Sequence, residues 1–268
     1  MVVRYGAAFV LSALMLVLGR LTATSTPQDY KIQIDHISLS HETVTESFGE
    51  KPRLFLKASS REGLEPVVYY SQKRGGPYQF EVMSPVDSGF VATLPVLEKN
   101  NKLWYRIMVF EQRKLLADFP PGEDQFVKFK GHVMPFVLIS HIVFMYAAIF
   151  AGLLTLLSAI DIILGKGNVR KSVRYVMWTL ILGVIGGFIF GPIVSYQTLG
   201  IPYEGIPFHK DITDSKTLIF MLFWVFTFFI SRRGLKGERM AVSEGAYALL
   251  VILSFIVTFG LFLIPHSI

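Results

Sequence analysis

The 268-residue chain contains no cysteine. This absence excludes disulfide bonds, metal sites built on thiolates, thioredoxin-like redox chemistry and the C-x-x-C-H attachment of covalent heme. Any exported part must therefore fold on its apolar core alone. A segment of about 105 residues, such as the one that precedes the apolar half, is long enough to bury such a core.

The sequence also lacks the short motifs that are typical of common enzyme active sites and metal sites. It holds no phosphate-binding loop, catalytic triad, zinc motif or paired-carboxylate arrangement, so no catalytic residue is predicted. The formal net charge is +6, yet residues 20–130 carry fifteen Lys/Arg against fourteen Asp/Glu. The positive excess belongs to the second half, where it reports membrane topology rather than a nucleic-acid surface.

Four apolar spans fill that second half and predict an α-helical transmembrane bundle. They are Val133–Ile160, Tyr175–Ser195, Thr217–Ile230 and Ala241–Ile264. The loops 166–174 and 232–239 hold eight Lys/Arg between them, and the positive-inside rule places both in the cytoplasm. The loop 196–216 and the C-terminus are then external. We expect a multi-pass protein of a bacterial-type inner membrane with its N-terminal half on the periplasmic side.

The first 25 residues resemble an export segment. Arg4 precedes an apolar run from Gly6 to Gly19, and small residues follow at Ala23-Thr24-Ser25. Fourteen apolar residues are short for a span but normal for a signal sequence. The segment is therefore either a cleaved signal peptide or a retained N-terminal anchor, and both deliver residues 26–130 across the membrane.

Residues 26–130 are typical of a β-sandwich. β-branched and aromatic runs alternate with the turn signals Gly75-Gly76-Pro77 and Asp87-Ser88-Gly89. The predicted strands are Ile32–Ser38, Arg53–Ala58, Val67–Ser71, Tyr78–Met83, Gly89–Leu94, Leu103–Phe110 and Lys114–Phe119. Their order resembles immunoglobulin-like and fibronectin type III-like modules, a likeness that implies a fold and names no activity. Residues 120–131 should connect this domain to the membrane domain, 131–268.

Histidines mark one side of the predicted bundle. His132, His141, His209 and His266 all fall at its external side. His141 lies twenty residues before Asp161, which places it near the outer boundary, at the level of His266. Ala148 and Gly152 follow on the helical face of His141, whereas His132, nine residues away, points to the opposite face. Two imidazoles at one depth on different helices suit a metal or a heme.

The membrane half resembles the cytochrome c assembly proteins, a heme-handling membrane family. The likeness rests on the His141 helix from Ser140 to Leu154, on Asp211 seven residues before Leu218-Ile219, on the basic loop from Arg233 to Ala241, and on the closing Pro265-His266-Ser267. These segments also follow one another in the family's order. The sequence departs from the family in having fewer spans and no tryptophan in the loop 196–216.

The resemblance implies a heme site on the external face. His141 and His266 would be the axial iron ligands, and Asp211 would fix the end of a covering loop. Tyr196, Tyr203 and Phe208 are the aromatic residues available in the loop, of which Tyr203 and Phe208 are expected at the porphyrin, and His209 could substitute as a ligand. The expected function is heme handling in cytochrome c-type biogenesis, with the sandwich docking a protein partner such as an apocytochrome or a respiratory-complex subunit.

Two other functions remain open at this stage. A bis-histidine membrane cytochrome for electron transport would use the same ligands but retain its heme. A cofactor-free accessory or assembly subunit would use the sandwich to bind a partner and the helices only as an anchor. In that last case His141 is a polar residue bonded to a neighbouring helix and His266 is a solvated terminal residue.

Overall fold

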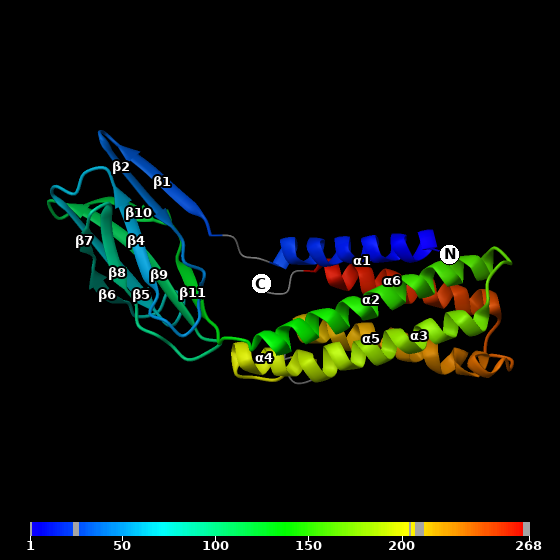
Figure 1. Cartoon of the computed structure of the whole chain (residues 1–268). Helices are drawn as coiled ribbons and strands as arrows, with labels where there is room; N and C mark the ends of the chain where they lie inside the picture. The colour runs from blue at the N-terminus through cyan, green and yellow to red at the C-terminus, as the bar shows by residue number, and fades with distance from the viewer. Residues whose placement is uncertain (1, 24–26, 204, 207–211, 265–268) are drawn as a thin grey trace. The chain divides into compact units, whose positions relative to one another are not determined.

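Two units make up the computed structural model, which describes residues 2–23, 27–203, 205–206 and 212–264 (Figure 1). The sheet unit comprises residues 25–132 with 197–200, and the helical unit comprises residues 1–24, 133–196 and 201–268. Sequence patterns placed the divisions at 25/26 and 130/131. Each unit has its own apolar core.

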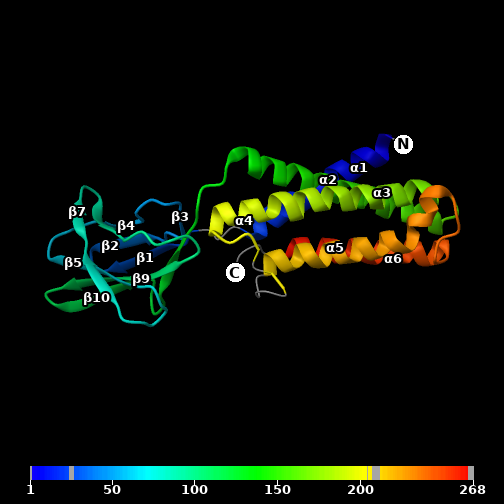
Figure 2. The same cartoon turned by 90° about the horizontal axis from the view of Figure 1, so that it is seen from below.

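The sheet unit contains two antiparallel-rich sheets that share one core, as in a β-sandwich (Figure 2). One sheet has the order β1-β2-β4-β8-β7 and the other the order β3-β11-β9-β5-β6, with β10 also paired to β9. The strands are β1 Asp29–Ile34, β2 Ile37–Glu42, β3 Glu46–Ser47, β4 Arg53–Ala58, β5 Leu64–Ser71, β6 Gln79–Val82, β7 Ser84–Val86, β8 Gly89–Thr93, β9 Lys102–Glu111, β10 Lys114–Phe119 and β11 Gln125–Phe129.

The alternation of side chains along the strands builds this core. In β9, Leu103, Tyr105, Ile107 and Val109 are buried, while the residues between them point outward. Leu54 and Leu56 of β4 meet them from the other sheet. Period-two burial of this kind is what a half-buried strand requires, and it explains how the unit forms without disulfides.

One predicted strand and the predicted connector differ from the structure. Ile32–Ser38 is not one strand. The chain reverses at Asp35, which adopts a left-handed φ of 49°, and Ile34 at the end of β1 pairs with Ile37 at the start of β2. The stretch 125–129, taken as a connector, is β11, which pairs with β9 and, in parallel, with β3. Its alternation of outward Phe126 and buried Val127 carried that signal.

A buried histidine joins the two sheets. His41 on β2 is fully buried, and its Nδ1 lies 2.8 Å from the carbonyl oxygen of Phe55. A carbonyl oxygen only accepts, so Nδ1 carries the hydrogen and Nε2 accepts from the Tyr105 hydroxyl, 3.2 Å away. That hydroxyl in turn accepts from the backbone N–H of Val44. Every polar atom of the group is satisfied only while His41 is neutral.

The sheet unit should therefore lose stability in acid. Burial lowers the pKa of His41, and the Phe55 carbonyl offsets only part of that effect. Since the unfolded chain then binds more protons than the folded one, stability is complete above about pH 6.5 and falls below it by up to about 1.4 kcal/mol per pH unit. Pulse proteolysis of the whole protein across pH 5 to 8, followed on β9 peptides, measures this.

The control for this pH dependence is the matched pair His41→Gln and His36→Gln. His36 is exposed, so its replacement should leave the acid loss unchanged, whereas glutamine at 41 does not titrate and should flatten it. Equal acid sensitivity in the wild type and in His41→Gln would contradict the assignment.

Among the described residues, four helices of the helical unit are long and apolar enough to cross a membrane, as in a multi-pass membrane protein. They are Pro135–Ile163, Val169–Leu199, Ser215–Lys236 and Glu244–Leu263. The elements behind them are α2 (Pro135–Ile163), α3 (Val169–Gly183), the π-helical η1 (Val184–Phe190), α4 (Gly191–Leu199), α5 (Ile212–Ser231), the 3-10 turn η2 (Arg232–Lys236) and α6 (Glu244–Leu263). A further helix, α1 (Val2–Ala23), packs on α2 and α6.

Small and hydroxylated residues hold the helices together. Trp224 is fully buried and donates from Nε1 to the Thr258 hydroxyl at 2.9 Å, and the Thr227 and Ser254 hydroxyls bond 2.8 Å apart. Tyr247 likewise donates to Ser172 at 2.8 Å. Lipid offers no hydrophobic drive between helices, so such bonds and close packing carry the association. The buried indole of Trp224 therefore joins α5 to α6.

Candidate functional site

The imidazole of His141 bonds to the neighbouring span. On α2, His141 is half-buried, and its Nδ1 lies 2.9 Å from the carbonyl oxygen of Gly186 in η1. Since the carbonyl accepts, Nδ1 carries the hydrogen and Nε2 keeps its lone pair. A histidine that ligates a metal is usually oriented in this way, with its second nitrogen donating to a carbonyl or carboxylate.

A π-helical turn presents that carbonyl. Residues 184–190 form η1 between α3 and α4, and the backbone N–H of Gly191 bonds to Gly186 O five residues back. The same carbonyl oxygen therefore receives both Gly191 N–H and His141 Nδ1–H. Single π turns inside α-helices are uncommon and often occur at functional sites.

Glycines let the spans approach at this point. A Cβ on Gly186 would lie 2.9 Å from Met145 Sδ and 3.0 Å from the backbone nitrogen of Met145. A Cβ on Gly187 would lie 2.5 Å from Thr217 Cγ2, and one on Gly183 would lie 2.9 Å from a ring atom of Phe220. Gly183 and Gly187 therefore belong to a close-packing surface that faces α5.

The face of α2 below His141 points into the bundle. Ala148 is fully buried, and Gly152 lies against Trp224 of α5 and Phe255 of α6. Gly191 lies beside the imidazole, where an added Cβ would be 3.8 Å from Cε1 of His141. His141 therefore belongs to the inward stripe of its helix, as its spacing to Ala148 and Gly152 predicts.

The structure describes only part of the predicted heme site. Tyr203 is half-buried and donates from its hydroxyl to the carbonyl oxygen of Ile206 at 2.8 Å. Four predicted site residues lie outside the described residues: Phe208, His209, Asp211 and His266. Within the described ranges, no three His, Asp or Glu side chains gather as they would around a bare metal ion.

His132 has a different place from the one its spacing suggests. Helix α2 begins at Pro135, so the helical phase that set His132 opposite His141 does not extend to it. It is exposed in the sheet unit, with its ring centroid 5.7 Å from that of Phe48. Pro135 at the first helical position explains where the helix starts.

Sequence reasoning missed the partner of His141. Gly186 and its π turn carry no conventional motif, and the stripe at spacing four draws attention away from Gly186 itself. The adjacent pair Gly186-Gly187, between Gly183 and Gly191, was the available signal of a departure from regular α-helix. Comparisons with protein-family models, curated proteins and solved structures found no match to this chain.

Gly186 should tolerate no side chain. We expect Gly186→Ala to destabilise the protein by about 1–3 kcal/mol, because the added Cβ meets the backbone of Met145 and η1 must move away from α2. Thermal unfolding in detergent measures the loss.

Gly260→Ala is the matched control, since an added Cβ there meets nothing within 4 Å and alanine favours helix. The close approach at Gly186 would be refuted by equal melting temperatures for the two variants.

Proposed function

We propose that this protein is an integral membrane heme-binding protein of the heme-handling type, with an external β-sandwich that docks a protein partner. The observation that carries the proposal is the fixed imidazole of His141, whose Nδ1–H is held by Gly186 O and whose Nε2 lone pair remains for iron. His141 fits one axial position of a heme.

The rest of the proposed site follows the family resemblance. His266 is the second proposed ligand, with His209 as its substitute, and Asp211, Tyr203 and Phe208 belong to the loop proposed to cover the porphyrin. Bound there, heme would supply a redox-active iron and a flat apolar surface. The chain's own part would be to hold one imidazole in a single tautomer and to keep small residues, Gly191 among them, beside it.

The outer face of the six-stranded sheet is the proposed docking surface. Phe80 and Val82 of the edge strand β6 are 66% and 61% exposed, and Tyr69 on β5 faces Phe80. Farther along, Lys102 lies over the ring of Phe126 and Arg74 over that of Trp104. An apolar face with an unpaired edge strand is typical of protein recognition. The proposed likeness to immunoglobulin-like or fibronectin type III-like modules agrees with such a role.

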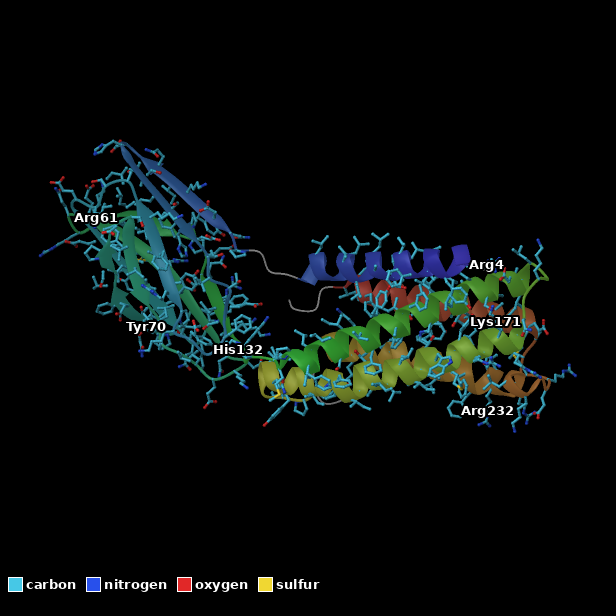
Figure 3. All side chains as sticks on the ribbon, in the orientation of Figure 1. Arg4, Arg61, Tyr70, His132, Lys171 and Arg232 are labelled. Atoms are coloured by element: carbon cyan, nitrogen blue, oxygen red, sulfur yellow. The ribbon has the colours of Figure 1, made fainter. Side chains whose placement is uncertain are left out.

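The proposed orientation rests on the distribution of cations. Lys171 on α3 and Arg232 on η2 lie at the same end of the helical unit as Arg4 (Figure 3), and Arg170 donates to the carbonyl oxygen of Lys236 at 3.2 Å. The positive-inside rule makes this end cytoplasmic. The N-terminal sandwich and the His141 end of α2 would then be periplasmic, in a bacterial-type inner membrane.

Heme content tests the proposal directly. Protein purified in detergent from cells supplied with heme should show a Soret band, and His141→Ala or His266→Ala should lower bound heme at least about tenfold, since each removes an axial ligand. His132→Ala and His36→Ala, both exposed histidines of the sheet unit, are the controls and should keep the band. A wild-type protein without a Soret band, or one whose band survives both ligand variants, excludes the proposal.

Two alternatives are separated by further measurements. A bis-histidine cytochrome would hold its heme stably and titrate reversibly between two redox states, whereas a heme-handling protein would release heme to an acceptor. A cofactor-free accessory subunit is favoured by one observation, namely that the His141–Gly186 bond joins two helices and needs no ligand. A stable complex purified with no heme absorbance would support that second candidate.

A further inference from the structure

The N-terminal helix α1 has a face shaped to the bundle. Ala8, Ser12, Met15 and Gly19 are buried, at spacings of four, three and four residues. An added Cβ on Gly19 would lie 3.4 Å from the carbonyl oxygen of Phe262 on α6. The opposite face carries exposed apolar side chains, among them Val10, Leu14 and Val17. One small-residue face and one lipid-type face are what a packed transmembrane helix needs.

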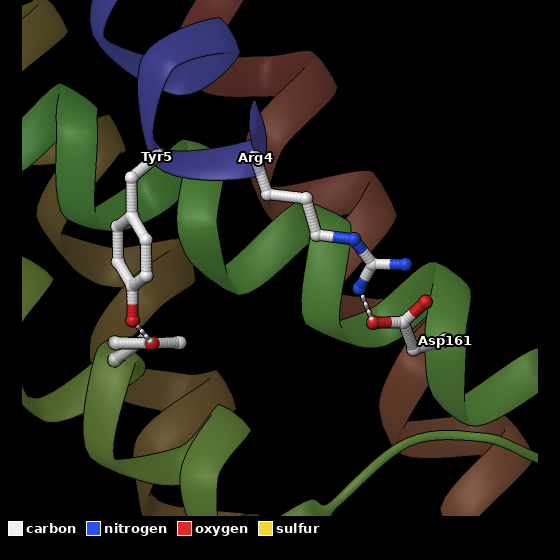
Figure 4. A network of polar contacts seen from close by, with 4 residues as sticks. Arg4, Tyr5 and Asp161 are labelled. Atoms are coloured by element: carbon white, nitrogen blue, oxygen red, sulfur yellow. Dashed lines mark hydrogen bonds and ion pairs between the residues drawn. The ribbon is translucent and has the colours of Figure 1, made fainter. Parts of the chain in front are cut away.

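Polar contacts secure the beginning of this helix. Arg4 forms an ion pair with Asp161 near the end of α2 (Figure 4). The hydroxyl of the next residue, Tyr5, lies 2.8 Å from that of Tyr175 on α3. Farther along, Tyr146 of α2 donates to the carbonyl oxygen of Phe9 at 3.1 Å, and their rings meet edge to face. Helix α1 thus bonds to two different spans.

These contacts bear on the choice between a signal peptide and an anchor. A signal sequence that is cleaved needs only a charge, an apolar run and a cleavage site. It has no need of small residues at helical spacing or of a carboxylate partner on a distant span. Asp161 is largely shielded, with 19% of its side chain exposed, and loss of α1 would leave this charge unpaired at the bundle.

We propose that α1 is a retained fifth membrane-spanning helix. It packs on α2 and α6, and the Arg4–Asp161 ion pair holds its first turn against α2. Its apolar stretch, Arg4–Gly19, is shorter than the other four spans, but the whole 22-residue helix is about 33 Å long, which matches the thickness of the hydrocarbon layer. Because α1 and α2 run in opposite directions, the chain crosses once before the sandwich and four times after it. This inference stands independently of whether heme binds.

Intact mass spectrometry of the purified full-length protein is the first test. Retention predicts a chain of 30.2 kDa, apart from modification of its first residue. A chain that begins near residue 26 overturns the proposal.

Two tryptophan variants test the packing of α1 on α2 and α6. Ala8→Trp fills the buried face, whereas Leu14→Trp changes the exposed face of the same helix. We expect Ala8→Trp to lower the melting temperature by on the order of 5 °C and Leu14→Trp to leave it within error. Both keep the segment apolar, so its membrane insertion should not differ. Equal melting temperatures for the two variants would show that the Ala8 face of α1 is not packed against the other helices, which overturns the proposal.

Exchange of the two charges tests the Arg4–Asp161 ion pair with little change in side-chain volume. Arg4→Glu and Asp161→Arg alone should each lower the melting temperature, and the double variant should recover most of the loss, because opposite charges then face each other again. Additive losses in the double variant overturn the ion pair.

Discussion

Close approach of α2 to η1 at Gly186 is the constraint on which the candidate site depends. In lipid, helices gain little from burying apolar surface against each other, so contact distance and polar bonds decide their packing. Four glycines within nine residues let α5 and α2 come near the span Val169–Leu199 from two sides. In the π turn at the same place, the carbonyl oxygen of Gly186 accepts hydrogen bonds from both Gly191 N–H and His141 Nδ1–H. The orientation of that imidazole is thus a consequence of helix packing.

The same logic runs through the rest of the bundle. Hydroxyl groups of Thr227, Ser254 and Thr258 bond across α5 and α6, and Trp224 fills the space beside Gly152. Helix α1 adds a third layer of this kind with its face from Ala8 to Gly19. It contacts α2, which carries His141, and α6, which precedes the proposed ligand His266 in the sequence. A retained α1 would therefore also brace the spacing of those helices.

The sheet unit solves a different problem, since it must be stable without disulfides. Its core joins both sheets through leucine, isoleucine and aromatic side chains, and the bonds among His41, Tyr105 and Phe55 satisfy the polar groups enclosed there. The buried residues thus stabilise the unit, and the exposed aromatic residues of β5 and β6 remain accessible for the proposed recognition of a partner.

The amino-acid sequence by itself determined the four apolar spans, their order and most of the strands, because hydropathy and alternation are local properties of the chain. It also located His141 on the inward face of its helix, since 3.6-residue periodicity is local too. Tertiary structure alone decided which atom His141 bonds, where the π turn falls, and that Arg4 meets Asp161 157 residues away. It also turned the predicted first strand into a hairpin and assigned 125–129 to the sheet. Those features arise from contacts between distant segments, whose partners no local pattern names.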